Sequence, residues 1–559
     1  MGAGSKHPGA MQVLGPDMSP PQSRTLFELL REQAGHFPER VAVICGERVA
    51  TYRALANAAG RVAAGLHAAG FGRGDRIGIL VNNRLEWLEC CFGAAALGAT
   101  AVPFSTWSKP QELAYLLADA EIEALFAVDG FAGQNFAEAL ATLVPEANGA
   151  VPGQWRSREF PRLRQIVMLG GHLQPGWIAY DEFCAAAAPL DMRGLAEGAR
   201  PEDDALILYT SGSSARPKAV RLRHYAVIEN GFNIGERMGL GPDDRVLLAP
   251  PLFWSYGAAN ALPATLSHGA TLVLQGRFEA SDWIGLVERH RCTAVYTLPS
   301  MTGAVLRHPE FRPERVNSLR TGLMIGSPEE VRVAAEELGA AQICNIYGST
   351  ETYGNCCVTP CGWPLDRRMH GQGPPLPGMM LRIVDAESGR VLPAGAPGAV
   401  EVAGYVTPGY AGASAAHNAA AFTPDGYFRT GDLGCLDDNG DFQFVARDAD
   451  IIKRAGINVS PAEIETLLLQ HPAVGQAAVV GAPAGELGEA IVAFVVPAPG
   501  MEIRREALRE HCRVLASSYK VPDRIEIRAA LPVTETGKLF RRALKEEAQA
   551  LIAEAAGKY

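Results

Sequence analysis

Short segments rich in β-branched residues alternate along most of this sequence with longer segments in which apolar residues recur at helical spacing. Helical spacing runs through residues 25–36, where Leu26, Leu29 and Leu30 share one face, and again through residues 52–69. The predicted strands occupy residues 41–45, 76–81, 101–102, 205–208, 244–248, 271–274, 293–296 and 342–346. Because parallel strands need a crossover between them, this order predicts an α/β fold of parallel sheets covered by helices.

The chain of 559 residues is too long for one hydrophobic core, so we expect at least two domains. Residues 360–447, richer in Pro and Gly and with predicted strands at 380–384 and 398–402, indicate a small β-rich subdomain. A new unit follows, with helices predicted at 461–471, 503–517 and 539–556 and strands at 477–481 and 490–496. We therefore predict a disordered segment at 1–24, a large N-terminal domain at 25–447, a hinge at 448–450 and a small mobile α+β C-terminal domain at 451–559.

Charge and apolar content exclude several classes of protein. The formal net charge is −10 and no long basic run is present, which disfavours binding to nucleic acid or to an anionic membrane surface. The longest apolar run, residues 87–104, is interrupted by Glu89 and falls short of the roughly 20 residues that a membrane span needs. The 11 cysteines lack metal-ligand spacing, which argues against zinc and favours free thiols. These features are typical of a cytoplasmic enzyme.

A loop rich in hydroxyl side chains follows the predicted strand at residues 205–208. Its sequence, Thr210-Ser211-Gly212-Ser213-Ser214, offers hydroxyl and closely spaced backbone N–H groups that can bind phosphate oxygens. The spacing of a Walker A motif is absent, and such a loop alone is more often a plain turn. The cationic side chains of Arg216 and Lys218 behind the loop favour a polyphosphate site.

A second polar segment, Tyr347-Gly348-Ser349-Thr350-Glu351, comes directly after the predicted strand at residues 342–346. Ligands of open parallel sheets bind at the carboxyl ends of the strands. Tyr347 is therefore a candidate to stack on a purine ring, and Thr350 with Glu351 would offer oxygen ligands to Mg²⁺. The alternative is a turn whose tyrosine packs in the core.

Three further positions in the sequence each carry one polar residue of interest. Asp432 stands just past a short aromatic strand and is a candidate acceptor for both hydroxyls of a ribose, or else a turn-capping carboxylate. Arg447 would reinforce the same sugar or phosphate. Lys538 follows a flexible glycine near the end of the chain. A reaction that joins a carboxylate to a phosphate must bring two anions together, and a lysine delivered from a distant segment suits that need.

In this order and spacing the motifs resemble those of the adenylate-forming superfamily, which contains acyl- and aryl-CoA synthetases, stand-alone adenylation domains and beetle luciferases. The resemblance runs from about residue 25 to residue 544, with motifs at residues 209–218, 251–257, 347–352, 427–434, 447–465 and 537–538. It implies a small C-terminal domain that rotates between two half-reactions. The first would form an acyl-adenylate from ATP with release of pyrophosphate, and the second would transfer the acyl group to a thiol.

The resemblance also implies roles for the matching residues. For ATP these are Thr210, Ser211, Gly212, Ser213, Ser214 and Lys218 at the phosphates, Gly326, Ser327, Pro328, Asn345, Ile346 and Tyr347 around the adenine, Gly348, Ser349 and Thr350 beside them, and Asp432 with Arg447 at the ribose. Catalytic roles fall to Lys538, Glu351 and Thr350, with Lys538 bridging the substrate carboxylate and the α-phosphate, and a Mg²⁺ site falls at Glu351 and Thr210. Gly456 would line the thiol route in the rotated state, and Ala449 occupies the hinge position.

Several residues depart from the family pattern. Ala215 and Ala219 stand where the phosphate loop usually has glycine, and a Cβ at a positive φ there would strain the loop. Ala455 replaces the first glycine of the usual pair before the thiol channel, and Ala449 replaces the usual Asp or Lys of the hinge. We expect the hinge rotation to survive, because a small residue tolerates it.

The acyl pocket is expected at Phe253, Trp254, Tyr256, Gly257, Asn260 and Ile325. This mixture of large and small residues predicts a broad apolar slot for a cyclic, aryl or bulky apolar acid, the alternative being that the aromatic residues pack the core. No aspartate lies in residues 251–257 to pair with a substrate amine, which argues against an amino acid.

The favoured function is an ATP-dependent carboxylate–CoA ligase that uses ATP, Mg²⁺ and coenzyme A. A second interpretation is a stand-alone enzyme that loads the phosphopantetheine of a carrier protein. A third, of another class, is a non-catalytic ATP-binding regulatory protein. A homodimer and an acyl carrier protein remain open as partners.

Overall fold

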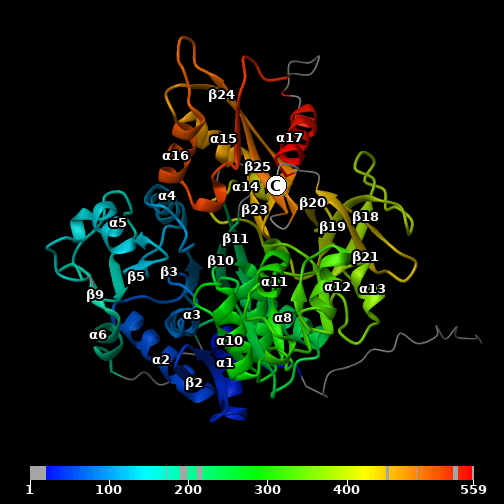
Figure 1. Cartoon of the computed structure of the whole chain (residues 1–559). Coiled ribbons are helices and arrows are strands. Elements are labelled where there is room, and N and C mark those ends of the chain that lie inside the picture. Colours follow the sequence, from blue (N-terminus) through cyan, green and yellow to red (C-terminus); the bar gives the residue numbers. More distant parts are fainter. Residues whose placement is uncertain are drawn as a thin grey trace, which may run out of the picture.

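The computed structural model describes residues 20–171, 173–188, 198–210, 217–447, 452–485, 488–532, 539 and 541–556. These residues form two helix-covered and mainly parallel sheets, a four-stranded antiparallel sheet and a small α+β unit. In Figure 1 the small unit, coloured orange to red, stands at the top of the view above the rest of the chain. The predicted α/β fold with a large N-terminal and a small C-terminal domain is confirmed.

The first sheet has eight strands, of which the inner six are parallel. Its inner strands are short, largely apolar and buried on both faces, as parallel strands under helices must be, whereas the edge strand at residues 48–51 is partly exposed. In spatial order they are β17 (Cys357–Val358), β16 (Gln342–Tyr347), β15 (Thr321–Met324), β14 (Ala294–Tyr296), β12 (Arg245–Leu248), β13 (Thr271–Leu274), β1 (Val41–Cys45) and β2 (Arg48–Thr51).

The second sheet has seven strands and is parallel except at one edge, where β10 and β11 form an antiparallel hairpin. In this hairpin Thr210 pairs with Lys218 across residues 211–216, which lie outside the described part of the chain. In spatial order the strands are β11 (Lys218–Arg223), β10 (Asp204–Thr210), β4 (Thr100–Pro103), β3 (Arg76–Leu80), β5 (Ala124–Val128), β8 (Gln165–Leu169) and β9 (Ile178–Ala179). A short hairpin joins β6 (Gly130–Phe131) and β7 (Gln134–Asn135).

Helices cover these sheets, and one large apolar core runs between both of them. They include α1 (Leu26–His36), α2 (Tyr52–Ala68), α3 (Leu85–Ala96), α4 (Pro110–Ala120), α5 (Phe136–Leu143), α6 (Tyr180–Ala185), α8 (His224–Met238), α9 (Leu262–Ser267), α10 (Ala280–His290), α11 (Pro299–Leu306), α12 (Pro328–Glu336), α13 (Leu365–Met369) and α14 (Ala415–Ala420). The short turns are η1 (Pro145–Ala147), η3 (Pro313–Arg315) and η4 (Thr350–Thr352). The apolar run at residues 87–104 forms most of α3 followed by β4.

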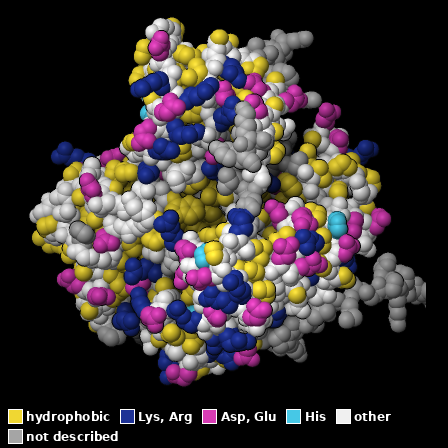
Figure 2. Space-filling model, in the orientation of Figure 1, with side chains coloured by type: hydrophobic (Ala, Val, Ile, Leu, Met, Phe, Trp, Pro, Cys, Tyr) yellow, Lys and Arg dark blue, Asp and Glu magenta, His cyan; other side chains and the backbone are white. Residues whose placement is uncertain are grey.

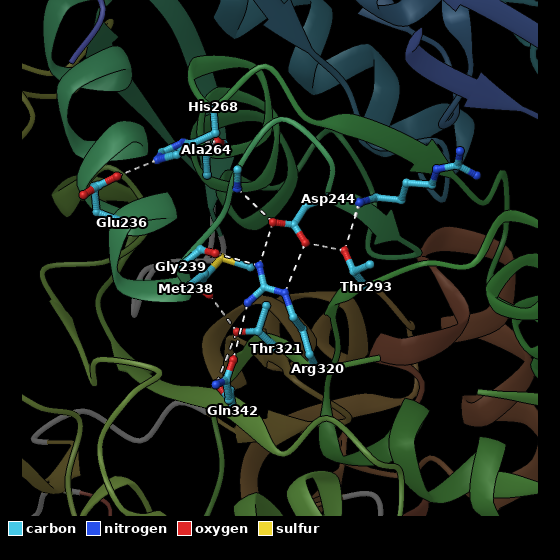
Figure 3. A network of polar contacts seen from close by, with 12 residues as sticks. Glu236, Met238, Gly239, Asp244, Ala264, His268, Thr293, Arg320, Thr321 and Gln342 are labelled. Atoms are coloured by element: carbon cyan, nitrogen blue, oxygen red, sulfur yellow. Dashed lines mark hydrogen bonds and ion pairs between the residues drawn. The ribbon is translucent and has the colours of Figure 1, made fainter. Parts of the chain in front are cut away.

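A buried carboxylate, Asp244, ties together the starts of the parallel strands of the first sheet (Figure 3). Arg320 Nη2 donates to Asp244 Oδ2 and to the Gly239 carbonyl, both at 2.6 Å. Thr293 Oγ1 donates to Asp244 Oδ1 at 2.6 Å. Because removing one partner of a buried charge is costly, this network stabilises the strand order at the edge opposite to the carboxyl ends.

The four-stranded antiparallel sheet is built from β18 (Met380–Val384), β19 (Gly398–Ala403), β20 (Phe428–Leu436) and β21 (Phe442–Arg447). Asp432 was expected just past a strand, but it lies inside β20, and its Cα is the register partner of the Arg447 Cα in β21. The two residues expected at one ribose are therefore cross-strand neighbours.

The small unit is a three-stranded sheet with helices on both faces. It contains the hairpin β22 (Ile452–Arg454) and β23 (Ile457–Val459), then α15 (Pro461–Leu469), β24 (Val474–Pro483), β25 (Glu489–Pro497), α16 (Arg505–Leu515), η6 (Ser518–Lys520), β26 (Arg524–Ile527) and α17 (Arg541–Ala556). One apolar cluster packs under α15 and α16, and another under α17. The two faces of the small sheet are therefore covered by different helices and carry separate apolar clusters.

The structure covers only part of the N-terminal segment that was predicted to be disordered. The backbone N–H groups of Gln22 and Ser23 donate to the Glu32 carboxylate at 3.1 and 2.8 Å, so residues 20–24 are held against α1 rather than disordered. Residues 1–19 lie outside the described part of the chain. Among the described residues, no helix combines the length and the apolar character that crossing a membrane requires.

Candidate active site

A cavity of about 530 Å³ lies between the carboxyl ends of β15 and β16, the strands β20 and β21, and the β22–β23 hairpin of the small unit. Its volume is in the range of small-molecule sites. The lining residues are Pro299, Ser300, Ile325, Gly326, Ser327, Pro328, Glu330, Ile346, Tyr347, Gly348, Met369, His370, Gln372, Asp432, Gln443, Phe444, Lys453, Ala455, Gly456 and Gly488. Figure 2 shows the molecule hollowed between its upper lobe and its body, with hydrophobic side chains on the floor of the hollow.

Asp432 and Tyr347 meet in this cavity although they come from different sheets. The Tyr347 hydroxyl donates to Asp432 Oδ2 at 2.8 Å, and Asp432 is only 4% exposed. The Tyr347 ring packs against Phe442, with centroids 4.4 Å apart, and against Phe444 at 6.0 Å. Burial and the Asp432 carboxylate raise the pKa of the Tyr347 phenol, so the hydroxyl stays protonated and donates. The pair presents an oriented carboxylate to a ligand.

The opposite wall of the cavity is a strand-to-helix turn. Ser327 caps α12, with its hydroxyl donating to Glu330 Oε2 at 2.8 Å, and Pro328 occupies the first helical position. Gly326 precedes this cap, where a Cβ would lie 3.1 Å from the Glu330 Cβ. Asn345, in contrast, is fully buried behind the wall, where its Nδ2 donates to the Gly371 carbonyl at 3.2 Å. Of the predicted adenine residues, Asn345 therefore supports the wall and does not line it.

A second group of predicted residues gathers around Tyr410. Its hydroxyl donates to Glu351 Oε1 at 3.0 Å, and Lys218 Nζ stands 5.0 Å from the centre of its ring. Burial and the Glu351 carboxylate raise the pKa of the Tyr410 phenol. Thr350 Oγ1 donates to Ser255 Oγ at 3.0 Å, and Thr210 pairs with Lys218 in the ladder. Tyr410 was missed, because no local motif marks an aromatic residue 59 positions from its partner.

These groups fit a magnesium ion that is held mainly by phosphate. Mg²⁺ typically takes one or two carboxylates from the protein and keeps its other positions for phosphate oxygens and water. Glu351 offers one half-buried carboxylate, with the Thr350 hydroxyl next to it and the Lys218 cation nearby. The predicted phosphate residues Ser211, Gly212, Ser213 and Ser214 lie outside the described part of the chain.

The predicted acyl residues divide into two sets. Phe253 and Trp254 form an aromatic cluster with Trp107, whose ring centroid lies 5.2 and 5.3 Å from theirs, nearly perpendicular in both cases. Ile325 is 42% exposed and lines the cavity. Trp107 was missed by the sequence reasoning, since it lies far from the motifs in the chain.

Tyr256, Gly257 and Asn260 instead pack the core in a π-helical turn, η2 (Tyr256–Ala261). The Tyr256 hydroxyl donates to the Leu323 carbonyl at 2.6 Å. Asn260 is fully buried and accepts from the Tyr296 hydroxyl at 2.8 Å. A Cβ on Gly257 would lie 2.5 Å from the Pro251 carbonyl oxygen. In this structure these three residues shape the site from behind, which corresponds to the alternative interpretation of the segment.

The small unit closes one side of the cavity with the tip of the β22–β23 hairpin. Ala455 and Gly456 form this tip with φ values of 47° and 80°. A Cβ on Gly456 would lie 2.7 Å from Leu298 of the large domain. Lys453 Nζ stands 4.2 Å from the Phe444 ring centre.

The strain expected at Ala219 is absent, because this residue sits in β11 opposite Tyr209 and is not among the residues with positive φ. Ala455 carries that strain instead. Ala215, Ala449 and Lys538 lie outside the described part of the chain, as does the side chain of Arg447.

Comparisons with known proteins agree with this architecture. A sequence profile of the AMP-binding enzyme family matches residues 30–411, and a profile of the AMP-binding enzyme C-terminal domain matches residues 463–538. A putative acyl-CoA synthetase from Bacillus subtilis (strain 168), YngI, is 31% identical over 532 residues, which cover 94% of this chain and 97% of that protein.

Two solved structures resemble the chain over almost its whole length. A double mutant of o-succinylbenzoate CoA synthetase (MenE) from Bacillus subtilis, bound with its product analogue OSB-NCoA, has a TM-score of 0.77 at 27% identity, covering 92% of this chain and 97% of that chain. The amide bond synthetase McbA from Marinactinospora thermotolerans has a TM-score of 0.79 at 27% identity, covering 93% and 99%. The chain belongs to the AMP-binding enzyme family, within the adenylate-forming superfamily, and is an AMP-forming acid–thiol ligase.

Proposed function

We propose that this ligase uses ATP to activate a bulky apolar carboxylic acid, cyclic or aryl, as its acyl-adenylate and then transfers the acyl group to the thiol of coenzyme A. The observation that carries the proposal is the cavity at the ends of β15 and β16. There the paired Tyr347 and Asp432 offer a carboxylate suited to a ribose, and the hairpin of the small domain forms the facing wall. CoA ligases among the similar proteins support the thiol acceptor.

In the first half-reaction a carboxylate oxygen of the acid attacks the α-phosphorus of ATP, and pyrophosphate leaves. The two reactants are both anionic, so neutralising and aligning them should dominate the barrier. Asp432 would accept the ribose hydroxyls, Lys218 would meet the phosphates, and Lys538 would bridge the carboxylate and the α-phosphate. Glu351 would hold Mg²⁺, which when bound would neutralise part of the phosphate charge.

In the second half-reaction the thiol sulfur attacks the carbonyl carbon of the acyl-adenylate, and AMP leaves with the bonding electrons on its phosphate oxygen. This step needs no cation between carboxylate and phosphate, but it needs a path for the thiol. The hairpin tip, where Gly456 approaches Leu298 too closely for any side chain, is suited to shape such a path.

The acid is proposed to be bulky and apolar because of the aromatic cluster of Trp107, Phe253 and Trp254. The three rings pack edge to face, and each pair of ring centroids lies within 6.2 Å. The cluster therefore places apolar aromatic surface beside the segment expected to hold the acyl group. Tyr256 fills the space behind this segment, against Tyr296 at 5.0 Å, and so favours a short, broad acid over a long linear one.

The proposal is tested by measuring pyrophosphate release with a panel of aryl, alicyclic and linear fatty acids, followed by thioester formation with CoA or with a carrier protein bearing phosphopantetheine. We expect the highest kcat/KM for an aryl or alicyclic acid, and thioester with free CoA. A preference for long linear acids would contradict the acid class. Transfer to the carrier protein alone would favour the second acceptor, and absence of pyrophosphate release with every acid would overturn the proposal.

A further inference from the structure

A buried ionic cluster joins the small domain to the large domain at a distance from the cavity. Lys520 Nζ, from η6 of the small domain, donates to Glu112 Oε1 of α4 and to Glu463 Oε1 of α15, both at 2.6 Å. Lys520 is 6% exposed, and the two carboxylate side chains are 15% and 13% exposed. Removing one member of such a cluster costs far more than removing one member of a surface ion pair, because it leaves an uncompensated charge where little water can reach it.

The two carboxylates are placed alike at the first turns of two helices. Glu112 and Glu463 each occupy the third helical position, where the helix dipole favours a negative charge. Glu112 Oε2 also accepts the Lys109 backbone N–H at 2.9 Å. Glu463 belongs to the same domain as Lys520 and stays with it in any orientation. Glu112 is therefore the member whose contact depends on how the domains are arranged.

A hydroxyl and an aromatic ring extend the same contact. Ser517 Oγ lies 2.7 Å from the Trp107 carbonyl oxygen and 2.9 Å from Glu112 Oε2, and Ser517 is 3% exposed. The Tyr519 ring stands edge-on to Trp107, with centroids 5.7 Å apart. Trp107 in turn touches the aromatic residues expected beside the acyl group. These contacts therefore hold the small domain in one orientation, beside the part of the cleft where the acyl group is expected.

This orientation presents the hairpin face of the small domain to the cavity. Ala455 and Gly456 line the cavity. Leu539, the described residue next to position 538, packs with Leu531 against the apolar cluster under α17, on the other face of the small sheet. A rigid domain cannot keep Ser517 on the Trp107 carbonyl and also turn that other face to the nucleotide. The contacts of Glu112 would therefore break in the rotated orientation in which, by the family resemblance, Lys538 meets the nucleotide.

We propose that Glu112, Ser517 and Lys520 form a latch that holds the small domain in the orientation for thiol transfer, which makes Glu112 a positioning residue for the second half-reaction. The latch rests on the proposed function for its role in catalysis. The contacts between the two domains do not depend on the proposed function, because they require only the folded chain. Breaking the latch should disfavour the thiol-transfer orientation and leave adenylate formation intact or faster.

The test is Glu112→Gln, which keeps an oxygen for the Lys109 N–H but removes the charge facing Lys520. Thioester formation from a supplied acyl-adenylate should slow by about tenfold or more, the scale of a lost hydrogen bond to a charged group. Pyrophosphate–ATP exchange driven by the acid should not slow. Glu28→Gln is the matched control, because Glu28 also closes a helical capping box, with Thr25, and within the described part of the chain it contacts no residue of the small domain. It should change neither rate.

Ser517→Ala, a smaller change, gives a second variant with the same expected pattern. Amide hydrogen exchange of residues 452–459 and 516–521 provides a readout that needs no activity, and Glu112→Gln should accelerate exchange there while Glu28→Gln does not. Equal slowing of both half-reactions, or unchanged thioester formation and unchanged exchange, would overturn the latch. If the wild type releases no pyrophosphate with any acid, the proposed function fails, and the exchange result alone decides the latch.

Discussion

Tyr347 is the last residue of β16 and Asp432 lies within β20 of a different sheet, and a hydrogen bond joins the two side chains. Each residue could be predicted at a nucleotide site, because each belongs to a short sequence motif. The hydrogen bond between the two side chains could not be predicted, because no sequence pattern gives the distance between an eight-stranded and a four-stranded sheet. The hydrogen bond fixes the orientation of the Asp432 carboxylate, which must point toward the ribose hydroxyls in order to accept hydrogen bonds from them.

Replacing Tyr347 with phenylalanine tests that bond. The ring and its packing on Phe442 remain, so the fold should hold, while Asp432 loses a donor in a buried place. We expect the KM for ATP to rise by roughly tenfold, the effect of losing about 1.4 kcal/mol of a hydrogen bond to a charged group. Steady-state kinetics of pyrophosphate release measures it.

Tyr405→Phe is a suitable comparison, because the Tyr405 hydroxyl also donates to a carboxylate, that of Glu229, outside the cavity. It should leave the KM for ATP unchanged. An unchanged KM in Tyr347→Phe as well would mean that Asp432 does not depend on this donor.

Other residues of the site carry no signal that sequence reasoning could use. Trp107, Glu112 and Tyr410 lie in segments without a motif, and their roles arise only because helices and loops far apart in the chain pack together. Lys520 looks like an ordinary surface lysine in the sequence, yet it is buried between two carboxylates.

At the scale of elements, the β22–β23 hairpin carries one of the departures from the family pattern, Ala455, in its turn. Two residues at its tip have positive φ, the conformation of a tight hairpin turn that favours glycine at both positions. The sequence holds glycine at Gly456 but alanine at Ala455. The sequence showed that glycines were missing. It could not show which replacement carries strain, because that depends on whether the backbone becomes a strand, as at Ala219, or a turn.

The two tip residues give opposite predictions. Gly456→Ala adds a Cβ at a strained φ of 80° and 2.7 Å from Leu298 Cδ1, so the hairpin or the Leu298 side chain must move. We expect it to slow thioester formation from acyl-adenylate by about tenfold or more, and adenylate formation much less. Ala455→Gly relieves backbone strain of roughly 1 kcal/mol and should keep both rates. Single-turnover measurements of the two half-reactions on both variants check this, and equal rates in Gly456→Ala and Ala455→Gly would contradict a role for the tip.

The regular elements themselves followed from the sequence to a large extent. Helix α1 and strands β1, β12 and β13 were predicted within one residue of their bounds, because apolar spacing and β-branched runs are local signals. Strand β20 was cut short in the prediction. Its Gly431, at a φ of 72°, resembles a turn residue in the sequence, but pairing with β19 and β21 carries the strand through Asp432.

At the scale of the whole molecule, the two domains share one cleft, and in the proposed function each face of the small domain would serve a different step. The structure holds the hairpin face at the cavity through Gly456 on Leu298 and through the cluster of Glu112, Ser517 and Lys520. The sequence could predict two domains and a rotation by resemblance. It could not predict which orientation is held or by which contacts, because interfaces between rigid bodies leave no periodic pattern.

The roles proposed for the two faces of the small domain are best distinguished by the rates of the two half-reactions in Lys538→Ala. Adenylate formation, measured as pyrophosphate release, should fall by about 10²–10³, the typical cost of losing one pre-aimed donor. Thioester formation from supplied acyl-adenylate should be retained, the reverse of the pattern expected for Glu112→Gln. Equal loss of both half-reactions in a folded Lys538→Ala protein would contradict the division of work between the two faces of the small domain.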